Sequence, residues 1–359
     1  MPTVRHENLR AVVRAVCAAA GSTGEEPADV ADNLVYANLT GHDSHGVGML
    51  PRYIKALQEG ELRANAKIDL LVDMGAMLVV DGKAGYGQSV GRQAMEVAIE
   101  RAKAHGVCVM AVRRSFHLCR IGAWGEQCAQ AGLVSIHYVN VVGHPGLVAP
   151  WRGSDARYAT NPYCITMPAT DTNPVTQLDM ATSIVAHGKV RVAKNKGERM
   201  APGVLIDSEG HPTTDPDVMF QHPMGAIMPF AEHKGYGMAL LSEMMAGVLS
   251  GGHTRRPETD HEQDTILNNM LSIVFDPARL VEPGFYNSEM DATIAHVKAS
   301  PPADPALPVL VPGDPERATH AERSRDGIPV DEETWRELEA AAVSVGIEVA
   351  EFRRTAGVN

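Results

Sequence analysis

The sequence has few aromatic residues and no long hydrophobic run. Only 5% of its 359 residues are Phe, Trp or Tyr, whereas there are 17 methionines, so we expect a core of aliphatic side chains and Met. No stretch approaches the ~20 consecutive apolar residues that span a membrane, and the first residues do not resemble a signal peptide. We therefore expect a soluble protein with one large domain or two to three smaller ones.

Positive charge and cysteine are also scarce. The 32 Lys and Arg residues face 44 Asp and Glu residues, which gives a net charge of -12. An acidic chain is a poor partner for nucleic acid or an anionic membrane, so we expect neither as a partner. The five cysteines are odd in number and none forms a C-x-x-C pair, which favours free thiols in a reduced, cytoplasmic protein.

Several catalytic motifs are missing. The sequence contains no G-x-x-x-x-G-K-[ST] loop for phosphoryl transfer, no G-x-S-x-G elbow for a hydrolase and no H-E-x-x-H zinc motif. His42 and His45 are near enough to share a metal ion, but no second cluster has convincing ligand spacing. We therefore predict no metal site.

What the sequence does contain is a dense polar loop at 41–48. Two histidines, an aspartate and a serine occupy four consecutive positions between glycines. Apolar residues at helical spacing precede the loop at 27–40 and follow it at 51–59. Titratable groups in a loop held by two helices suit a catalytic site. The alternative is a capping turn, which explains the aspartate and the serine but not two histidines.

The hydrophobic pattern along the whole chain predicts both helices and strands. A helical block of roughly 60 residues comes first, and a mixture of strands and helices follows. Further helices are predicted at 5–20, 90–104, 123–131, 238–249, 286–298 and 331–345, and strands at 77–80, 107–112, 134–139, 271–275 and 309–311. Residues 163–167 form a further apolar segment.

A glycine-rich turn at 82–91 separates the first of these strands from the next helix. Gly85, Gly87 and Gly91 approximate a dinucleotide-binding fingerprint with one extra spacer. The glycines do not follow the strand directly, and the next strand ends in two arginines at 113–114 instead of an acid. The arginines could suit a 2′-phosphate, and the alternative is a purely structural turn.

Four other places carry chemically useful residues. His117 and Arg120 stand at a strand-to-helix junction, where anions often bind. Asp179 ends a strand-like run and is either a functional acid or the N-cap of a following helix. Lys234 lies near a helix N-terminus, where a cation is unfavourable unless an anion is close. The basic residues of 187–199 form either a solvated loop or a phosphate site.

Eight stretches, taken in order, resemble one known family. They are Gly41–Gly46 with Leu50–Tyr53, Ser115–Gly122, Thr160–Pro162, Leu178–Ser183, Gly188–Lys189, Pro212–Pro216, His233–Tyr236 and Pro312–Gly313. Together they resemble the malate/L-lactate dehydrogenase family that lacks a Rossmann fold, and within it the bacterial hydroxycarboxylate dehydrogenase branch. The likeness extends from about residue 8 to residue 345.

The resemblance implies an α/β fold with a mixed, largely antiparallel sheet. It implies a non-Rossmann NAD(P)-binding domain over residues 76–299 and a mainly helical domain from residues 1–75 and 300–359, which carries the His45 loop. It implies a homodimer that interconverts a 2-hydroxy acid and a 2-oxo acid with NAD or NADP, of which we favour NAD. It also implies that the cofactor binds away from the glycine-rich turn.

The resemblance also assigns roles to residues. His45 is expected to donate and accept the proton, with Asp179 as the acid that orients and charges it and His117 as a third catalytic candidate. Ser44, Arg52 and His117 are expected to bind the substrate, since arginine can bind a carboxylate with two hydrogen bonds. Cofactor contacts are expected from His45, Arg120, Ile121, Thr160, Leu178, Asp179, Met180, Ala181, Lys234, Gly313, Asp314 and Pro315.

Two other functions are compatible with the same residues. Some relatives reduce cyclic imino acids, so an imine reductase is one alternative. A dinucleotide-binding protein without catalysis is the other, and the intact pair of His45 and Asp179 argues against it.

Overall fold

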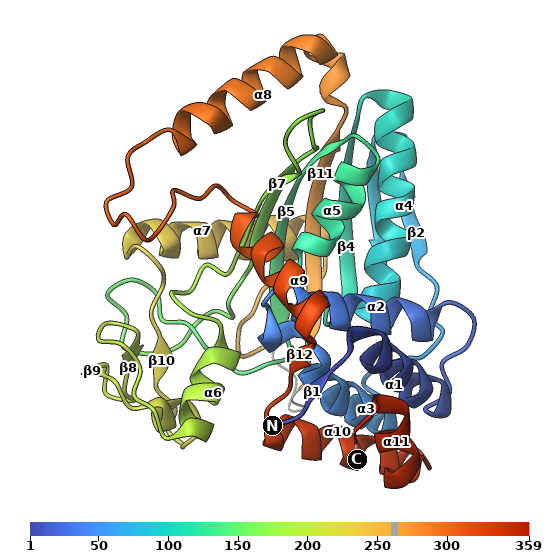
Figure 1. The fold of residues 1–359 in the computed structure, drawn as a ribbon, viewed down its shortest axis with the longest axis vertical. Helices are drawn as coiled ribbons and strands as arrows, with labels where there is room; N and C mark the ends of the chain where they lie inside the picture. Colours follow the sequence, from blue (N-terminus) through green and yellow to red (C-terminus); the bar gives the residue numbers. More distant parts are fainter. Residues whose placement is uncertain (260–264, 359) are drawn as a thin grey trace.

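The structure is a computed structural model that describes residues 1–259 and 265–358. Its centre is a seven-stranded sheet with the strand order β2-β3-β4-β11-β5-β6-β7 (Figure 1). A three-stranded sheet, β10-β8-β9, and a two-stranded pair, β1-β12, lie outside it. The strands of the large sheet are β2 (Asp69–Asp73), β3 (Met77–Asp81), β4 (Val107–Phe116), β5 (Val134–Val142), β6 (Tyr163–Met167), β7 (Thr176–Met180) and β11 (Leu267–Phe275).

Among the described strands of the large sheet, one neighbouring pair is parallel. Strands β3 and β4 run in the same direction because helix α4 (Gly87–His105) connects them as a crossover. The other neighbouring pairs are antiparallel. Strand β11 arrives from far along the chain and pairs with β4 on one side and β5 on the other. The prediction of a mixed, largely antiparallel sheet is therefore confirmed.

The two faces of this sheet are packed differently. Helices α4 and α5 (Gly122–Gln130) cover one face, where Met95, Val139 and other apolar side chains form a core. Helix α7 (His233–Glu243) covers the other face, to which Asn140 points because successive strand residues alternate. The Asn140 amide donates to a Glu243 carboxylate oxygen at 2.9 Å. The face under α7 is thus packed through buried polar contacts.

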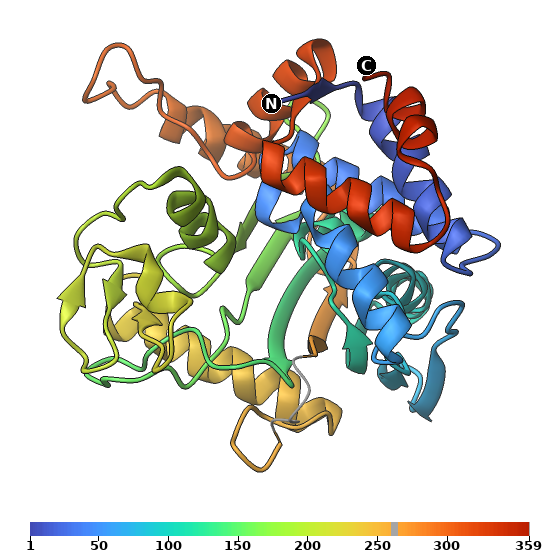
Figure 2. The same cartoon turned by 90° about the horizontal axis from the view of Figure 1, so that it is seen from below.

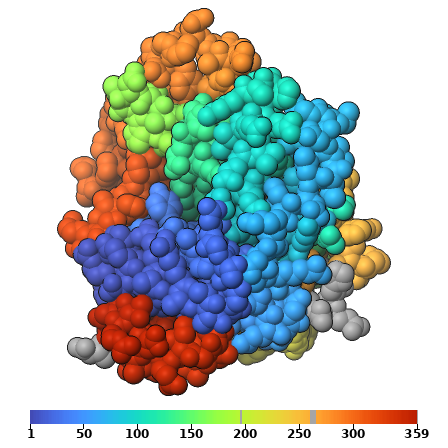
Figure 3. All heavy atoms as spheres, turned by 90° about the vertical axis from the view of Figure 1, so that its right-hand side faces the viewer, coloured from blue at the N-terminus to red at the C-terminus, as the bar shows by residue number. Residues whose placement is uncertain are grey.

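Both ends of the chain build one helical lobe. Strand β1 (Thr3–Val4) pairs with β12 (Ile328–Pro329), which joins the first residues to the last part of the chain. Figure 2 shows the terminal helices side by side, and in Figure 3 the blue and red residues form one continuous surface. The helices of this lobe are α1 (His6–Ala19), α2 (Glu26–Leu39), α3 (Leu50–Glu59), α10 (Glu332–Ser344) and α11 (Val349–Ala356).

A third packing unit lies beside the large sheet. Strands β8 (Leu205–Ile206), β9 (Pro212–Thr213) and β10 (Ala226–Ile227) form its small sheet, and helix α6 (His187–Lys196) packs nearby. Val190 of α6 is buried in its apolar core. The start of α6 also contacts the 43–45 turn, so this unit helps to enclose the polar loop.

The predicted helices and strands are confirmed except the strand at 309–311, which the structure does not contain, and the apolar segment at 163–167 is strand β6. Several elements were missed, among them the short strands β1, β8, β9, β10 and β12. The sequence predicted either a solvated loop or a phosphate site where helix α6 lies, and a turn where α9 (Asp314–Asp326) begins. Both helices were missed because they are rich in charge, and α9 buries none of its residues. Strand β2 and helix α11 were also missed. No helix starts at Met180, which ends β7. Helix α8 (Pro283–Lys298) matches the helix predicted at 286–298.

The predicted division into two domains remains a prediction, and one strand complicates it. Strand β2 lies within residues 1–75, yet it pairs with β3 and so belongs to the sheet. The terminal helices do share one apolar core, as the prediction requires for a helical unit. Among the described residues, no helix is both long and apolar enough to cross a bilayer.

Candidate active site

The polar loop between α2 and α3 consists of two short 3-10 turns, at Asp43–His45 and Val47–Met49. Asn38, in the last turn of α2, holds both turns. Its Oδ1 accepts from the Val47 backbone N–H at 2.8 Å, and its Nδ2 donates to Asp43 Oδ1 at 2.7 Å. One buried amide therefore fixes the conformation of the loop that carries the histidines.

A second contact fixes the loop from the C-terminal part of the chain. Arg323 of α9 donates to both oxygens of Asp43, at 2.6 and 2.9 Å. Gly46 is needed because a Cβ at this position would collide with the Asn38 amide. Asp43 therefore has a structural role in the motif, and the loop is held from two separate segments, the end of α2 and α9.

The imidazole of His45 is held by its own neighbour in the loop. Its Nδ1 lies 2.9 Å from Ser44 Oγ. The ring is stacked on that of His117, with 5.6 Å between centroids and 24° between planes. These contacts orient His45 and leave its Nε2 as the nitrogen available to a substrate.

His117 is braced from the helical lobe. Its Nδ1 lies 2.7 Å from the Tyr53 hydroxyl, which also accepts from Gln88 Nε2 at 3.1 Å. Tyr53 is fully buried in α3, and Gln88 lies in the first turn of α4. The pair of stacked imidazoles is therefore held by side chains from α3 and α4.

Burial keeps both imidazoles neutral at pH 7. It lowers the pKa of His45 to about 4, and the negative charge of Asp179 opposes this shift without overcoming it. Burial also drives the pKa of His117 well below its usual range, and the positive charge of Arg52 acts in the same direction. The expectation that Asp179 leaves His45 with a raised pKa is therefore corrected, because loss of water outweighs the carboxylate.

Asp179 is bound by a helix N-terminus. Its Oδ2 accepts from the backbone N–H of Gly122, the first residue of α5, at 2.8 Å. Gly122 has no side chain, which allows Asp179 and Arg120 to approach it closely. Among the described residues there is no hydrogen bond between Asp179 and His45, so the carboxylate acts on the imidazole through its charge.

Arg120 forms the wall next to this carboxylate. It is 3% exposed and donates to Glu126 and, at 3.2 Å, to Gln177 Oε1. Its guanidinium also lies over the Tyr36 ring, 5.2 Å from the centroid. The Arg120 charge is thus largely compensated within the protein.

Cavities open on both sides of His45. One has a volume of about 250 Å³ and is called the substrate cavity below, because the residues that the sequence predicted for the substrate line it. A smaller one, of about 60 Å³, shares His45 and Thr160 with it and is called the inner cofactor cavity. Residues that the sequence predicted for the cofactor line this inner cavity: Arg120, Ile121, Thr160, Asp179, Met180 and Ala181.

A third cavity lies on the other side of Arg120 and is called the outer cofactor cavity. Its volume is about 460 Å³, and Tyr36, Glu126 and Gln177, which contact Arg120, form part of its wall. Gly313, the N-cap of α9, and Glu316 line it as well. The two cofactor cavities therefore follow one another along the edge of β7, the last strand of the sheet.

Comparisons with known proteins identify the family. The family model of malate/L-lactate dehydrogenases matches residues 4–339. The chain is 44% identical to hydroxycarboxylate dehydrogenase B of Escherichia coli K12, over 95% of this chain and 94% of that protein, and 37% identical to L-lactate dehydrogenase of Cupriavidus necator, over 95% and 97%. An E. coli structure assigned to the malate/lactate dehydrogenases superposes with a TM-score of 0.95 at 41% identity, covering 99% of this chain and 100% of that one.

The chain belongs to the malate/L-lactate dehydrogenase family. It is an oxidoreductase that acts on the CH–OH group of a 2-hydroxy acid, and its class uses a nicotinamide cofactor. This dehydrogenase brings most of the predicted site residues together around His45. Ser44, Arg52 and His117, predicted to bind the substrate, all line the substrate cavity.

Other predicted cofactor residues of the dehydrogenase lie at or beyond the edge of these cavities. Leu178 is 38% exposed in β7, next to Asp179. Asp314 and Pro315 begin α9 directly after Gly313, and Asp314 is bonded to Arg317 at 2.6 Å. Lys234 is exposed in the first turn of α7 and lines none of the three cavities. The cofactor role of Lys234 thus remains a prediction without a contact to these walls.

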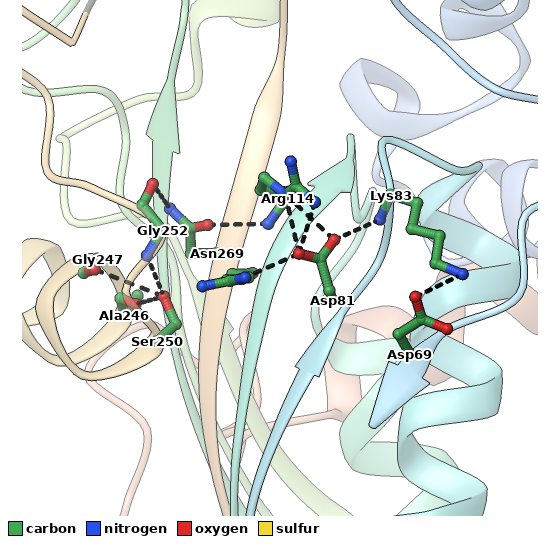
Figure 4. Close-up of polar contacts among 10 residues, drawn as sticks. Asp69, Asp81, Lys83, Arg114, Ala246, Gly247, Ser250, Gly252 and Asn269 are labelled. Atoms are coloured by element: carbon green, nitrogen blue, oxygen red, sulfur yellow. Dashed lines mark hydrogen bonds and ion pairs between the residues drawn. The ribbon is translucent and has the colours of Figure 1, made fainter. Parts of the chain in front are cut away.

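Arg113 and Arg114, considered for a 2′-phosphate, are bound to a carboxylate of the protein. Both guanidinium groups contact Asp81, whose side chain is 3% exposed, at 2.9 and 2.7 Å (Figure 4). The backbone N–H of Arg114 also donates to Asn269 Oδ1 at 3.0 Å. These arginines link the neighbouring strands β3, β4 and β11 of the sheet. The pairing supports the structural alternative, and a contact with a 2′-phosphate stays a prediction that no finding tests.

The glycine-rich turn is packed against protein. A Cβ on Gly87 would collide with the backbone carbonyl of His117, and one on Gly85 would lie 2.5 Å from the Ala66 Cβ. The glycines therefore allow α4 to approach the His117 segment, which accounts for their spacing. This agrees with the expectation that the cofactor binds elsewhere.

Sequence reasoning missed several residues of the substrate cavity. His144, His187 and Arg191 line it together with Met49 and Leu147. His187 and Arg191 belong to the basic segment 187–199, which was recognised, but no local pattern shows which of its side chains turn inward. Among the described residues, no group of three or more His, Cys, Asp or Glu side chains is placed to hold a metal ion.

Proposed function

We propose that this dehydrogenase transfers a hydride between the C4 atom of a nicotinamide and the C2 atom of a 2-hydroxy or 2-oxo acid, with His45 as the acid/base. The observation that supports this is the position of His45, which lines both the substrate cavity and the inner cofactor cavity. A proton-exchanging group between two adjoining cavities can reach the hydroxyl oxygen while the carbon faces the other cavity.

The residues of the cofactor cavities fit a nicotinamide dinucleotide. The inner cavity offers the edge of β7 at 178–181, and the outer cavity begins near the N-terminus of α9 at Gly313, where backbone N–H groups suit a phosphate. Glu316 Oε2 is buried without a hydrogen-bond partner among the described residues, so it can accept from a ribose hydroxyl. When bound, the cofactor supplies or accepts the hydride.

We favour NAD over NADP for electrostatic reasons. Two carboxylates, Glu126 and Glu316, line the outer cavity. A hydrogen bond from His42 lowers the pKa of Glu316, so its carboxylate is charged at pH 7. The guanidinium of Arg317 donates to the Val175 carbonyl at 2.8 Å and to Asp314 at 2.6 Å. A 2′-phosphate would be repelled by the Glu316 carboxylate, whereas a ribose hydroxyl can donate a hydrogen bond to it.

His45 acts as a general base when the 2-hydroxy acid is oxidised. Its neutral imidazole accepts the hydroxyl proton at Nε2, while Nδ1 keeps the contact with Ser44 that fixes the ring. The negative charge of Asp179 stabilises the imidazolium that forms. In the reverse direction the same imidazolium donates its proton to the carbonyl oxygen. Arg52 and His117 hold the C1 carboxylate beside it.

We also propose a cytoplasmic homodimer. All five cysteines are buried free thiols, which supports a reducing compartment. An exposed apolar stripe on α7 and the turn after it supports association with a second copy, since such stripes are uncommon on monomers. The stripe consists of Leu241, Met244, Val248 and Leu249.

The proposed reaction is tested with His45→Gln, which keeps a similar side-chain length. We expect kcat to fall by about 10²- to 10⁴-fold while NADH still binds with nearly unchanged affinity. Oxidation of NADH at 340 nm with a panel of 2-oxo acids measures turnover, and fluorescence titration measures NADH binding. His211→Gln, in an exposed turn, is the matched control.

Two results would contradict the proposal. Retained turnover by the His45 variant would show that another group exchanges the proton. Rapid turnover of cyclic imines with none of any 2-oxo acid would replace the reaction with imine reduction.

A further inference from the structure

One arginine of the substrate cavity has no bonding partner within the described chain. Arg191 lies on α6, is half-buried, and forms no hydrogen bond or ion pair with any described residue. Two other cations of this segment do have partners: Lys194 lies 3.3 Å from Asp217, and Arg199 lies 3.3 Å from Asp215. An unpaired, partly desolvated guanidinium is a strong binding group for an anion.

Arg191 also lies where two cavities meet. Besides the substrate cavity it lines a second one of about 380 Å³, between α6 and the start of α10, which is called the distal cavity below. Ser44, Gly188 and Arg191 line both, whereas His45, Arg52 and His117 line the substrate cavity and not the distal one. Arg191 therefore lies on the side of the substrate cavity that adjoins the distal cavity, which His45, Arg52 and His117 do not line.

A glycine makes the space for this guanidinium. A Cβ on Gly48 would lie 3.8 Å from Arg191 Nη2 and 3.3 Å from Thr334 Cγ2. A longer side chain at position 48 would occupy the gap between the loop and α10. The start of α6 is also fixed, because Gly188 packs closely against Ser44. The position of Arg191 is thus set by the loop that carries the catalytic histidine.

One carboxylate lies near Arg191 without forming an ion pair with it within the described chain: Asp331, in the distal cavity, whose pKa the Arg191 charge helps to lower. None of the described residues that line the substrate cavity is Asp or Glu. His187, on the same helix, is neutral because burial lowers its pKa to about 4, and its Nε2 is buried with no hydrogen-bond partner in the described chain. In the distal cavity, the carboxylate of Asp331 caps α10 by accepting from the Thr334 N–H at 2.9 Å.

We propose that Arg191 binds a second acidic group of the substrate, at the end remote from C2. The preferred substrates are then 2-hydroxy and 2-oxo acids whose side chain carries a carboxylate or sulfonate, and Arg191 is the residue that selects them. His187 Nε2 is placed to assist as a second polar contact. This inference rests on the proposed function, because it assigns the far end of the same substrate.

The test compares two substrates of similar size. Oxaloacetate carries a second carboxylate, whereas 2-oxobutyrate has a methyl group in its place. For Arg191→Met we expect kcat/KM to fall about 100-fold or more with oxaloacetate, chiefly through KM, and only a few-fold with 2-oxobutyrate. Arg191→Lys should recover part of the loss, since a point charge replaces the guanidinium.

Controls separate this role from a structural one. Arg199→Met removes a cation from the same segment and should change neither substrate. NADH affinity and the thermal unfolding midpoint of Arg191→Met should match the wild type, since Arg191 lines neither cofactor cavity. Gly48→Leu, which fills the gap from the opposite side, should weaken oxaloacetate selectively.

Three outcomes would overturn the inference. Equal losses with both substrates would place the C1 carboxylate on Arg191. An unchanged kcat/KM with both substrates would show that Arg191 contacts neither of them. A wild type that prefers 2-oxobutyrate would show that the enzyme does not select a second acidic group. If the wild type reduces no 2-oxo acid at all, the proposed function fails first, which is visible before any variant is made.

Discussion

His45 combines two demands that oppose each other. In the proposed oxidation the proton acceptor must be a neutral imidazole, and burial provides it by lowering the pKa of His45 to about 4. The return reaction needs the imidazolium, which the charge of Asp179 stabilises. Because that carboxylate is held by the Gly122 N–H and not by His45 itself, it can act on the charge without restraining the ring.

The first prediction concerns this carboxylate. In the oxidation of a 2-hydroxy acid, kcat/KM depends on neutral His45, so activity is present above the pKa and is lost as the pH falls through it. Asp179→Asn removes the charge that raises this pKa and keeps an oxygen for the Gly122 N–H. The acid limb should therefore move to lower pH, and reduction at pH 7 should slow about tenfold for each pH unit by which that limb moves.

The measurement is a pair of pH profiles of kcat/KM, one for each direction of the reaction. An acid limb at the same pH in the variant would show that Asp179 does not act on His45 through charge. An unchanged unfolding midpoint would confirm that the substitution leaves the fold intact.

At the scale of single residues, the sequence predicted the residues of the motifs but not the contacts that they make with distant parts of the chain. His45, Asp179 and Arg120 were found from the matching motifs, and the structure gathers them around the cofactor cavities. Arg191 was seen only as one of several basic residues. Its inward position depends on Gly48, far away in the sequence, and no local pattern records that contact.

At the scale of elements, α4 and the turn before it position His117. The helix begins at Gly87, where any side chain would meet the His117 carbonyl, and its first turn carries Gln88, which bonds Tyr53. The turn that resembled a dinucleotide fingerprint therefore contributes to the substrate side of the site. Its glycines permit contact with the protein backbone.

We predict that Gly87→Ala destabilises the fold and impairs catalysis together. The added methyl group must displace the His117 segment or the start of α4, at a cost of about 1–3 kcal/mol in the free energy of unfolding. KM for the 2-oxo acid should rise because His117 moves. Urea unfolding and steady-state kinetics measure the two effects.

Gly284→Ala provides the matched control. Gly284 lies in the first turn of α8 with no atom within 4 Å of an added Cβ, so the change should be neutral or slightly stabilising. If Gly87→Ala behaved in the same way, the close approach to His117 would not constrain this element.

Periodicity explains which elements the sequence revealed. Helix α1 buries Leu9, Val12, Val13 and Val16 at helical spacing, and its predicted range of 5–20 is confirmed within one residue at each end. Helix α9 has no buried residue and therefore no apolar pattern to detect, although Arg323 on it holds the loop that carries His45. An element fixed mainly by polar contacts is invisible to hydrophobic spacing.

At the scale of the whole molecule, the order of the strands could not be deduced from the chain alone. Strand β11 is inserted between β4 and β5, and the first and last helices share a core. Both features join residues that are distant in sequence. The antiparallel sheet and the helical unit from both termini were expected only because the motifs resemble a known family.

The remaining prediction concerns assembly. Leu241, Met244 and Val248 repeat along one side of α7 and the turn that extends it, and each is about half exposed. If a second copy covers this stripe, the wild type should sediment at about twice the 38.5 kDa chain mass. Leu241→Asp combined with Val248→Asp should yield monomers, because buried, unpaired charges are costly in an interface.

Met74→Asp is the control for this experiment, since Met74 is also exposed but lies in the turn between β2 and β3. Sedimentation velocity at several concentrations gives the answer. A wild-type monomer, or a dimer that survives the double substitution, would rule out this stripe as the interface.

The pairing of β1 with β12 has a consequence for synthesis. A nascent chain that has emerged as far as the large sheet still lacks the segment from residue 328 onward, which closes the lobe around the catalytic loop. While the ribosome holds that segment, the N-terminal helices have an exposed apolar face and no partner for it. The lobe around the His45 loop can therefore close only after residues 328–356 have emerged from the ribosome, and a chain released before that point would lack the closed lobe.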